Sequence, residues 1–153
     1  MKNSLPGEVV VEICDFNGDE MRCLMQKLEQ ELLQIYPGMP RSSPLQPSLA
    51  LVARAGARPL GCVALLPWGT EAAEIKRLFI EPSARRHGLA KRLLAELERQ
   101  ASQFGIKRLL VETGNLQAPA LSLYQSLGYR PIAPFGPYIG NPVSCCFEKL
   151  LGH

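Results

Sequence analysis

The sequence predicts an α+β fold in which helices flank a mixed, mostly antiparallel sheet. Short apolar runs separated by turn residues fill the first half of the chain, as in an antiparallel meander. A strand–helix–strand crossover over residues 74–113 predicts one parallel pair, central and buried. One further stretch, from Met21 to about Ile35, has the apolar spacing of an amphipathic helix. With 153 residues, 46% of them hydrophobic, the chain is predicted to form a single domain over residues 1–153.

The first half of the chain predicts one helix among short strands. Apolar residues at helical spacing predict a helix from Met21 to about Ile35 that buries one face. Asn17 or Asp19 precedes this helix as a candidate N-cap. Strands are predicted at residues 8–13, 48–54, 60–66 and about 72–80.

A loop rich in proline and serine is predicted at residues 39–47. It is interpreted either as part of a lid over a substrate or as a plain connector.

The second half predicts two helices, each followed by a strand. The first helix covers residues 87–103 and ends at Gly105, a plausible left-handed cap. The second covers residues 119–127 and ends at Gly128, with proline at its first turn. Strands are predicted at residues 108–113, 129–133 and 143–150, and residues 134–142 between the last two predict a rigid aromatic loop.

Composition excludes several classes of protein. The net charge of +3 is compatible with an anionic cofactor but too small to indicate nucleic-acid binding. No apolar run approaches the roughly 18 residues of a membrane span, and residues 1–7 lack the apolar core of a secretory leader. The five cysteines are odd in number and contain no Cys-x-x-Cys pair, which argues against a disulfide framework and against a metal site. Reduced thiols indicate the cytoplasm.

A basic turn at residues 85–90, Arg-Arg-His-Gly-Leu-Ala, joins a predicted strand to a predicted helix. The first N–H groups of a helix have no intrahelical partner and carry partial positive charge, so they can bind an anion such as phosphate. Gly88 permits close approach of the backbone to a ligand. The turn lacks the spacing of a P-loop and two of the three glycines of a dinucleotide fingerprint. The same residues also fit an ordinary basic strand–helix junction.

Three segments in the same order resemble the GCN5-related N-acetyltransferases (the GNAT superfamily). Arg85-x-x-Gly88-x-Ala90 resembles the family's Q/R-x-x-G-x-G/A signature, and residues 74–82 look like its fourth strand and the turn after it. Residues 123–129, Leu-Tyr-Gln-Ser-Leu-Gly-Tyr, look like its late L-Y-x-x-x-G-F/Y segment. The resemblance covers residues 73–129 strongly. It implies a three-layer αβα sandwich whose central parallel strands splay apart.

The resemblance also implies acetyl-coenzyme A as donor and an amine as acceptor. The pyrophosphate would bind the turn mainly through backbone atoms, and the pantetheine arm would pair with the backbone of the fourth strand. Many relatives carry an asparagine where this chain has Gln117; Asn115, two residues earlier, is the alternative amide. The residues assigned to the coenzyme are Leu78, Phe79, Ile80, Arg85, Arg86, His87, Gly88, Leu89, Ala90, Lys91 and Gln117.

Direct transfer, without an acyl-enzyme, is the chemistry that the resemblance implies. An alkyl ammonium has a pKa of roughly 10, so a base must remove a proton. Glu74 is the first candidate for that base or for a water-mediated relay, and Glu112 is the second; Glu74 could instead be a surface or acceptor-binding carboxylate. Tyr124 matches the family tyrosine that protonates the leaving thiolate, although it could be a core aromatic. His87 fits the phosphate turn better than a role as base.

These observations predict an N-acetyltransferase that acts on a small amine or amino acid, because the short chain leaves no room for a further recognition domain. The alternatives are a protein lysine or N-terminal acetyltransferase, a non-catalytic acyl-CoA-binding module, and a regulatory partner-binding domain. No nucleic-acid, membrane or metal partner is expected. A homodimer is possible, and the oligomeric state stays open.

Overall fold

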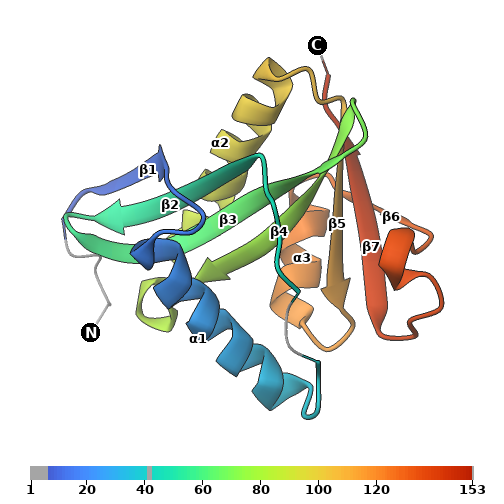
Figure 1. The fold of residues 1–153 in the computed structure, drawn as a ribbon, viewed down its shortest axis with the longest axis horizontal. Coiled ribbons are helices and arrows are strands. Elements are labelled where there is room, and N and C mark those ends of the chain that lie inside the picture. The colour runs from blue at the N-terminus through green and yellow to red at the C-terminus, as the bar shows by residue number, and fades with distance from the viewer. Residues whose placement is uncertain (1–6, 41–42, 153) are drawn as a thin grey trace.

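The computed structural model describes residues 7–40 and 43–152 and contains one 7-stranded mixed sheet in the order β1-β2-β3-β4-β5-β7-β6 (Figure 1). Residues 1–6, 41–42 and 153 lie outside the described part. The prediction that residues 1–7 lack a secretory leader falls mostly on these residues, and the predicted loop at 39–47 falls partly on them. The strands are β1 (Val9–Ile13), β2 (Leu49–Ala55), β3 (Arg58–Trp68), β4 (Ala72–Ile80), β5 (Arg108–Gly114), β6 (Arg130–Ile132) and β7 (Ser144–Leu150). The helices are α1 (Asp19–Ile35), α2 (Leu89–Gln103) and α3 (Ala118–Ser126), with two short 3-10 turns, η1 (Pro82–Ala84) and η2 (Gly136–Tyr138).

The helices cover opposite faces of the sheet, which confirms the three-layer prediction. In Figure 1 α1 lies in front of the sheet and α2 behind it. Met21 and Leu24 of α1 pack in one apolar cluster with Val52, Cys62 and Phe79 from three strands. The second cluster lies on the other face and contains the buried leucines of α2 and Tyr124 of α3. Alternation along each strand divides its side chains between these two clusters.

The parallel pair of strands separates partway along its length. Residues 72–75 of β4 pair with residues 108–111 of β5, and the pairing stops there although both strands continue. Figure 1 shows β4 and β5 diverging from that point toward their carboxyl ends. On its other edge β5 stays paired with β7 from Arg108 to Gly114. The opening therefore lies between β4 and β5, as the resemblance implied.

A β-bulge in β4 accompanies the separation. The register between β3 and β4 shifts, because Cys62 pairs with Phe79 while Ala64 pairs with Lys76. The extra residue falls at Arg77, whose φ of 60° is a left-handed value. A bulge bends a strand and increases its twist, so it turns the second half of β4 away from β5.

Several predicted boundaries differ from the structure. The N-cap of α1 is Gly18, with no side-chain cap hydrogen bond, so the prediction of Asn17 or Asp19 was wrong. The Asp19 carboxylate lies inside the first turn and pairs with Arg22 at 3.0 Å. The helix predicted from residue 87 begins at Leu89, because the residue before it, Gly88, has a φ of 75° that a right-handed helix does not allow.

Candidate active site

A cavity of about 520 Å³ lies where β4 and β5 separate. Its walls come from α1 and the loop after it, the ends of β3 and β5, the bulged part of β4, the start of α3, and η2. Both catalytic candidates, Glu74 and Tyr124, line it, as do Glu112 and Gln117. His87 lies outside this lining and is half-buried in the turn before α2.

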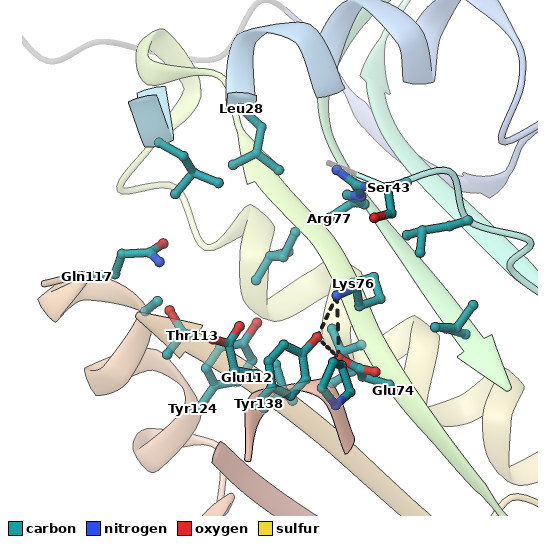
Figure 2. A pocket seen from close by; sticks show the side chains of 18 of the residues that line it. Leu28, Ser43, Glu74, Lys76, Arg77, Glu112, Thr113, Gln117, Tyr124 and Tyr138 are labelled. Carbon is teal, nitrogen blue, oxygen red and sulfur yellow. Dashed lines mark hydrogen bonds and ion pairs between the residues drawn. The ribbon is translucent and has the colours of Figure 1, made fainter. Parts of the chain in front are cut away.

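Glu74 is a buried carboxylate with two polar partners in the cavity. Its side chain is 3% exposed, and the Tyr138 hydroxyl donates a hydrogen bond to its Oε2 at 2.6 Å. Lys76 Nζ lies 3.5 Å from the same oxygen and donates to the Tyr138 hydroxyl oxygen at 2.7 Å. Figure 2 shows these three side chains meeting at one corner of the cavity. Lys76 and Tyr138 thus orient the carboxylate and compensate its charge.

Tyr138 reaches Glu74 because the loop before β7 is anchored on Trp68 at the end of β3. The Phe135 ring packs edge-on against the rings of Trp68 and Tyr138, with 5.4 Å and 5.2 Å between the ring centres. Gly136 is needed here, since a Cβ at this position would overlap the Trp68 ring. Burial, together with the hydrogen bond to Glu74, raises the pKa of Tyr138 above that of an ordinary phenol. Tyr138 therefore acts as a neutral donor.

Tyr124 approaches the cavity from α3. It is 4% exposed. Its ring packs edge-on against Tyr129 and tilted against Phe147, with 5.5 Å and 6.3 Å between the ring centres. Within residues 7–40 and 43–152 its hydroxyl makes no hydrogen bond. Burial raises the pKa of Tyr124 above its usual value. The phenol is therefore protonated at neutral pH and free to donate to a ligand.

Glu112 and Gln117 complete the polar lining on the β5 side. Glu112 Oε2 accepts a hydrogen bond from the Ser144 hydroxyl of β7 at 2.6 Å. Gln117 is the N-cap of α3, yet its side chain makes no cap hydrogen bond. Asn115, the alternative amide, is exposed and lies outside the cavity lining. Of the two amides, the structure thus brings only Gln117 to the cavity.

The turn before α2 presents a row of free backbone donors. Among the described residues, the N–H groups of residues 86–91 meet no backbone acceptor, and the first such bond of α2 is Arg92 N to Gly88 O at 3.1 Å. Gly88 has a φ of 75°, and no atom lies within 4 Å of the point that a Cβ would occupy, so the space in front of the turn is open. Arg86 also has a left-handed φ, of 68°. Leu89 is buried beneath the turn, Ala90 is half-buried and Lys91 is exposed.

Arg85 has a different position from the rest of the turn. Its Nε donates to the Ile80 carbonyl oxygen at 2.9 Å, and its Nη2 bonds to Glu31 of α1 at 2.6 Å. Its guanidinium also lies 5.6 Å from the centre of the Phe79 ring. The side chain therefore fastens the end of β4 to α1 and leaves the backbone to face an anion.

The other predicted strand residues have distinct environments. The Phe79 ring is buried against α1, and Leu78 and Ile80 pack at the edge of the core on the α2 face. The β4 backbone of residues 76–80 is unpaired on the β5 side. An extended ligand could therefore hydrogen-bond along this edge.

Sequence reasoning assigned Lys76 and Arg77 no role in the site and placed Tyr138 only within the aromatic loop at residues 134–142. Lys76 had a usable signal: it lies two residues from Glu74 on a strand and so shares its face. Tyr138 is 64 positions from Glu74, and no local pattern connects them. The Arg77 side chain faces the cavity because of the bulge in β4, and strict strand alternation does not predict a bulge.

Neither a metal site nor a membrane span is found in the part of the chain that the structure describes. Its residues contain no group of three or more His, Cys, Asp or Glu side chains that could hold a metal ion. No helix within the same ranges is both long and apolar enough to cross a membrane.

Comparisons with known proteins agree on one family. The model of the "Acetyltransferase (GNAT) family" matches residues 15–129. The chain is 35% identical over 136 residues to "IAA acetyltransferase" of Azospirillum brasilense, which covers 84% of this chain and 88% of that protein. A Klebsiella pneumoniae protein assigned as an acyl-CoA N-acyltransferase superposes with a TM-score of 0.84 at 30% identity, covering 94% of this chain and 98% of that one. A GNAT family acetyltransferase of Elizabethkingia anophelis with acetyl-CoA bound shares the fold, with a TM-score of 0.69 at 21% identity over 94% of this chain and 98% of that one.

Proposed function

Because the chain belongs to the acetyltransferase (GNAT) family and is an acetyl-CoA-dependent N-acetyltransferase, we propose that its acceptor is the primary amine of a small molecule or amino acid. The observation that carries this proposal is the buried carboxylate of Glu74 in a cavity of about 520 Å³. A space of this size suits a small ligand, since small-molecule sites typically measure about 300–1,000 Å³. The loop after α1 and η2 both line the cavity, which further supports a small acceptor.

The coenzyme is assigned to the turn before α2 and to the free edge of β4. The N–H groups of Arg86, His87, Gly88, Leu89, Ala90 and Lys91 would hold the pyrophosphate, supported by their open surroundings at Gly88. The backbone of residues 78–80 would pair with the pantetheine arm, and the Gln117 amide would contact it from the other side. A free N–H of β4 is then positioned to polarise the thioester carbonyl.

Glu74 and Tyr124 would manage the two protons of the reaction. Glu74 receives a proton from the acceptor ammonium, directly or through water, so that the neutral amine can bond to the carbonyl carbon. The carbon–sulfur bond breaks, and Tyr124 donates its hydroxyl proton to the leaving sulfur. The nitrogen loses its second proton to water as the amide forms, and Tyr124 recovers a proton from solvent. Orientation of both substrates in one cavity supplies much of the rate. Glu112, on the opposite wall, is the second candidate for the base.

Two properties of the whole protein belong to the same proposal. Residues 1–153 are proposed to form one catalytic domain, supported by a single sheet that joins β1 to β7. A cytoplasmic location is supported by the five cysteines, which are all free thiols.

An acceptor panel tests the proposal. The purified protein is incubated with acetyl-CoA and either primary amines and amino acids or lysine-containing peptides and proteins, and free thiol release is measured with an acceptor-free control. Turnover with the small amines, lost in Glu74→Gln with coenzyme affinity retained, is expected. Turnover with peptides and proteins alone would overturn the proposal in favour of a protein lysine or N-terminal acetyltransferase.

A further inference from the structure

We infer that the acceptor carries a carboxylate beside its amine and an apolar body, as in an apolar amino acid, and that Arg77 binds the carboxylate. The inference rests on the proposed function, because it describes the acceptor of that same cavity. It assigns Arg77 a binding role that the family resemblance did not imply.

The bulge in β4 brings the Arg77 side chain to the cavity. Before the bulge, Lys76 pairs with Ala64 on the α1 face of the sheet; after it, Phe79 pairs with Cys62 on that same face. Residues 76 and 79 are three apart, so alternation must fail once between them, and two consecutive side chains share a face. Leu78 packs on the opposite face. The consecutive pair is therefore Lys76 and Arg77, and both line the cavity.

Three features of Arg77 at this position reduce the stability of the fold. Its φ of 60° is rare for a residue with a side chain and costs about 1–3 kcal/mol. Burial lowers the pKa of its guanidinium. Its Nη2 donates to the Ser43 carbonyl oxygen at 3.0 Å, while its buried Nε has no partner within the described chain. Strain, desolvation and an unsatisfied donor at one residue are typical of a functional site.

Among the described residues that line the cavity, Arg77 is the cation available to a ligand. Lys76 is already engaged by Glu74 and Tyr138. Arg77 forms no ion pair within 4.0 Å in the described residues, although Glu29 lies near enough to raise its pKa. A guanidinium binds a carboxylate through paired, charge-assisted hydrogen bonds. The phosphates of the coenzyme are assigned to the start of α2, on the helix that covers the other face.

The walls and the spacing of the charges define the rest of the ligand. Glu74 and Arg77 are three residues apart on one strand, which separates their Cα atoms by roughly 10 Å. Both side chains line the same cavity, with Arg77 beside Ser43 and Glu74 beside Tyr138 (Figure 2), so one molecule can contact both opposite charges. The apolar side chains around them come from α1, the loop after it and the end of β3; they are Leu28, Leu32, Met39, Leu45, Leu66 and Trp68. An amine, a carboxylate and an apolar side chain together match this lining.

Matched acceptors test the inference. The kcat/KM of acetylation is measured for leucine, leucinamide and 3-methylbutylamine, and for phenylalanine with its amide and 2-phenylethylamine, each corrected for the fraction of free amine. We expect the amino acids to exceed the uncharged analogues by about 30-fold, the value of a charge-assisted contact. Arg77→Gln should remove this preference by lowering kcat/KM for the amino acids alone. Arg99→Gln, an exposed arginine on α2 paired with Glu96, is the matched control and should change nothing.

The outcomes separate the inference from the function on which it rests. Acetylation of the amines at the same rate as the amino acids overturns the inference and leaves the proposed function standing. An equal loss with all acceptors in Arg77→Gln also overturns it. Turnover with peptides alone refutes the proposed function, and the inference with it.

Two measurements without turnover distinguish binding from a structural role. Trp68, the single tryptophan, lines the cavity, so its fluorescence reports leucine binding in the presence of coenzyme A. Arg77→Gln should weaken that binding by about 30-fold. It should leave the thermal midpoint equal or higher, because it removes a buried charge with an unsatisfied donor. A lower midpoint together with unchanged leucine affinity would make Arg77 a structural residue.

Discussion

The Tyr138 hydroxyl donates a 2.6 Å hydrogen bond to Glu74, although the two residues are 64 positions apart. One belongs to β4 and the other to the 3-10 turn that precedes β7. Lys76 contacts both residues, so the Glu74 carboxylate is held by a lysine from its own strand and by a tyrosine from a distant loop. This contact links the position of the loop to the orientation of the proposed base.

Removal of the Tyr138 hydroxyl should slow acetylation. The hydroxyl orients the Glu74 carboxylate, so its loss leaves the proposed base less well positioned for proton transfer. In Tyr138→Phe we expect kcat/KM at neutral pH to fall about 10-fold. Tyr36→Phe is the control, because the Tyr36 hydroxyl accepts from Leu116 N–H and does not contact Glu74. Unchanged kcat/KM in Tyr138→Phe would separate this contact from catalysis.

Tyr124→Phe should slow turnover while the coenzyme still binds. The ring that packs on Tyr129 and Phe147 is kept, and only the proton donor is lost. We expect kcat to fall about 10²-fold, with the acetyl-CoA dissociation constant from calorimetry unchanged. Because burial raises the pKa of Tyr124, the wild type should show no alkaline loss from this group near neutral pH.

The control for this substitution is Tyr129→Phe. Tyr129 is equally buried, donates its hydroxyl to Glu98 at 2.8 Å and does not line the cavity. Its variant should keep kcat. Normal turnover in Tyr124→Phe would show that Tyr124 is only a core aromatic.

A side chain at Gly88 should weaken binding of acetyl-CoA. Gly88→Ala adds a methyl group to the open space before α2 and costs about 1 kcal/mol because of the positive φ. Gly105→Ala imposes a similar cost at the other end of the same helix, where φ is 81°. Both variants should lose similar stability, but only Gly88→Ala should raise the KM for acetyl-CoA, by about 10-fold. Equal KM values in the two variants would contradict the assignment of the turn.

Glu148 should contribute to the acid sensitivity of the fold. Arg108 and Arg130 lie at 2.5 Å and 2.6 Å from this buried carboxylate, and their hydrogen bonds lower its pKa. A lowered folded-state pKa adds stability above the unfolded value of roughly 4.3 and loses it as the pH falls through the folded value. Urea unfolding at pH 7 should show Glu148→Gln less stable by about 1 kcal/mol, a modest value because both arginines are partly exposed. The difference should shrink at pH 3; a constant difference would exclude the ionic origin.

Local patterns were sufficient to predict the elements of this fold. Apolar spacing located α1 and α2 within two residues, and Pro119 and Gly128 located α3 equally well. Gly105 and Gly128 mark helix ends with left-handed φ values. These features depend on neighbouring residues, which a single sequence contains. The prediction of Asp19 as the N-cap of α1 was wrong because its carboxylate pairs with Arg22 inside the helix. A bond to a side chain and a bond to the backbone at the cap are local alternatives of similar energy.

The polar network of the cavity could not be predicted in the same way. Tyr138 depends on the packing of its loop against Trp68, a contact that exists only after the sheet has formed. Arg77 depends on a bulge that reverses the alternation of β4. With regular alternation, Arg77 would face α2 and its core. The extra residue of the bulge therefore explains why the Arg77 side chain lines the cavity.

A crystal structure of the complex with acetyl-CoA would show whether the coenzyme enters between the two diverging strands. We expect pyrophosphate oxygens within hydrogen-bond distance of the N–H groups of residues 86–91. We also expect the pantetheine arm between β4 and β5, with the sulfur beside the Tyr124 hydroxyl and the acetyl carbonyl facing the cavity that holds Glu74. A coenzyme bound elsewhere, or strands β4 and β5 paired along their whole length in the complex, would contradict this mechanism.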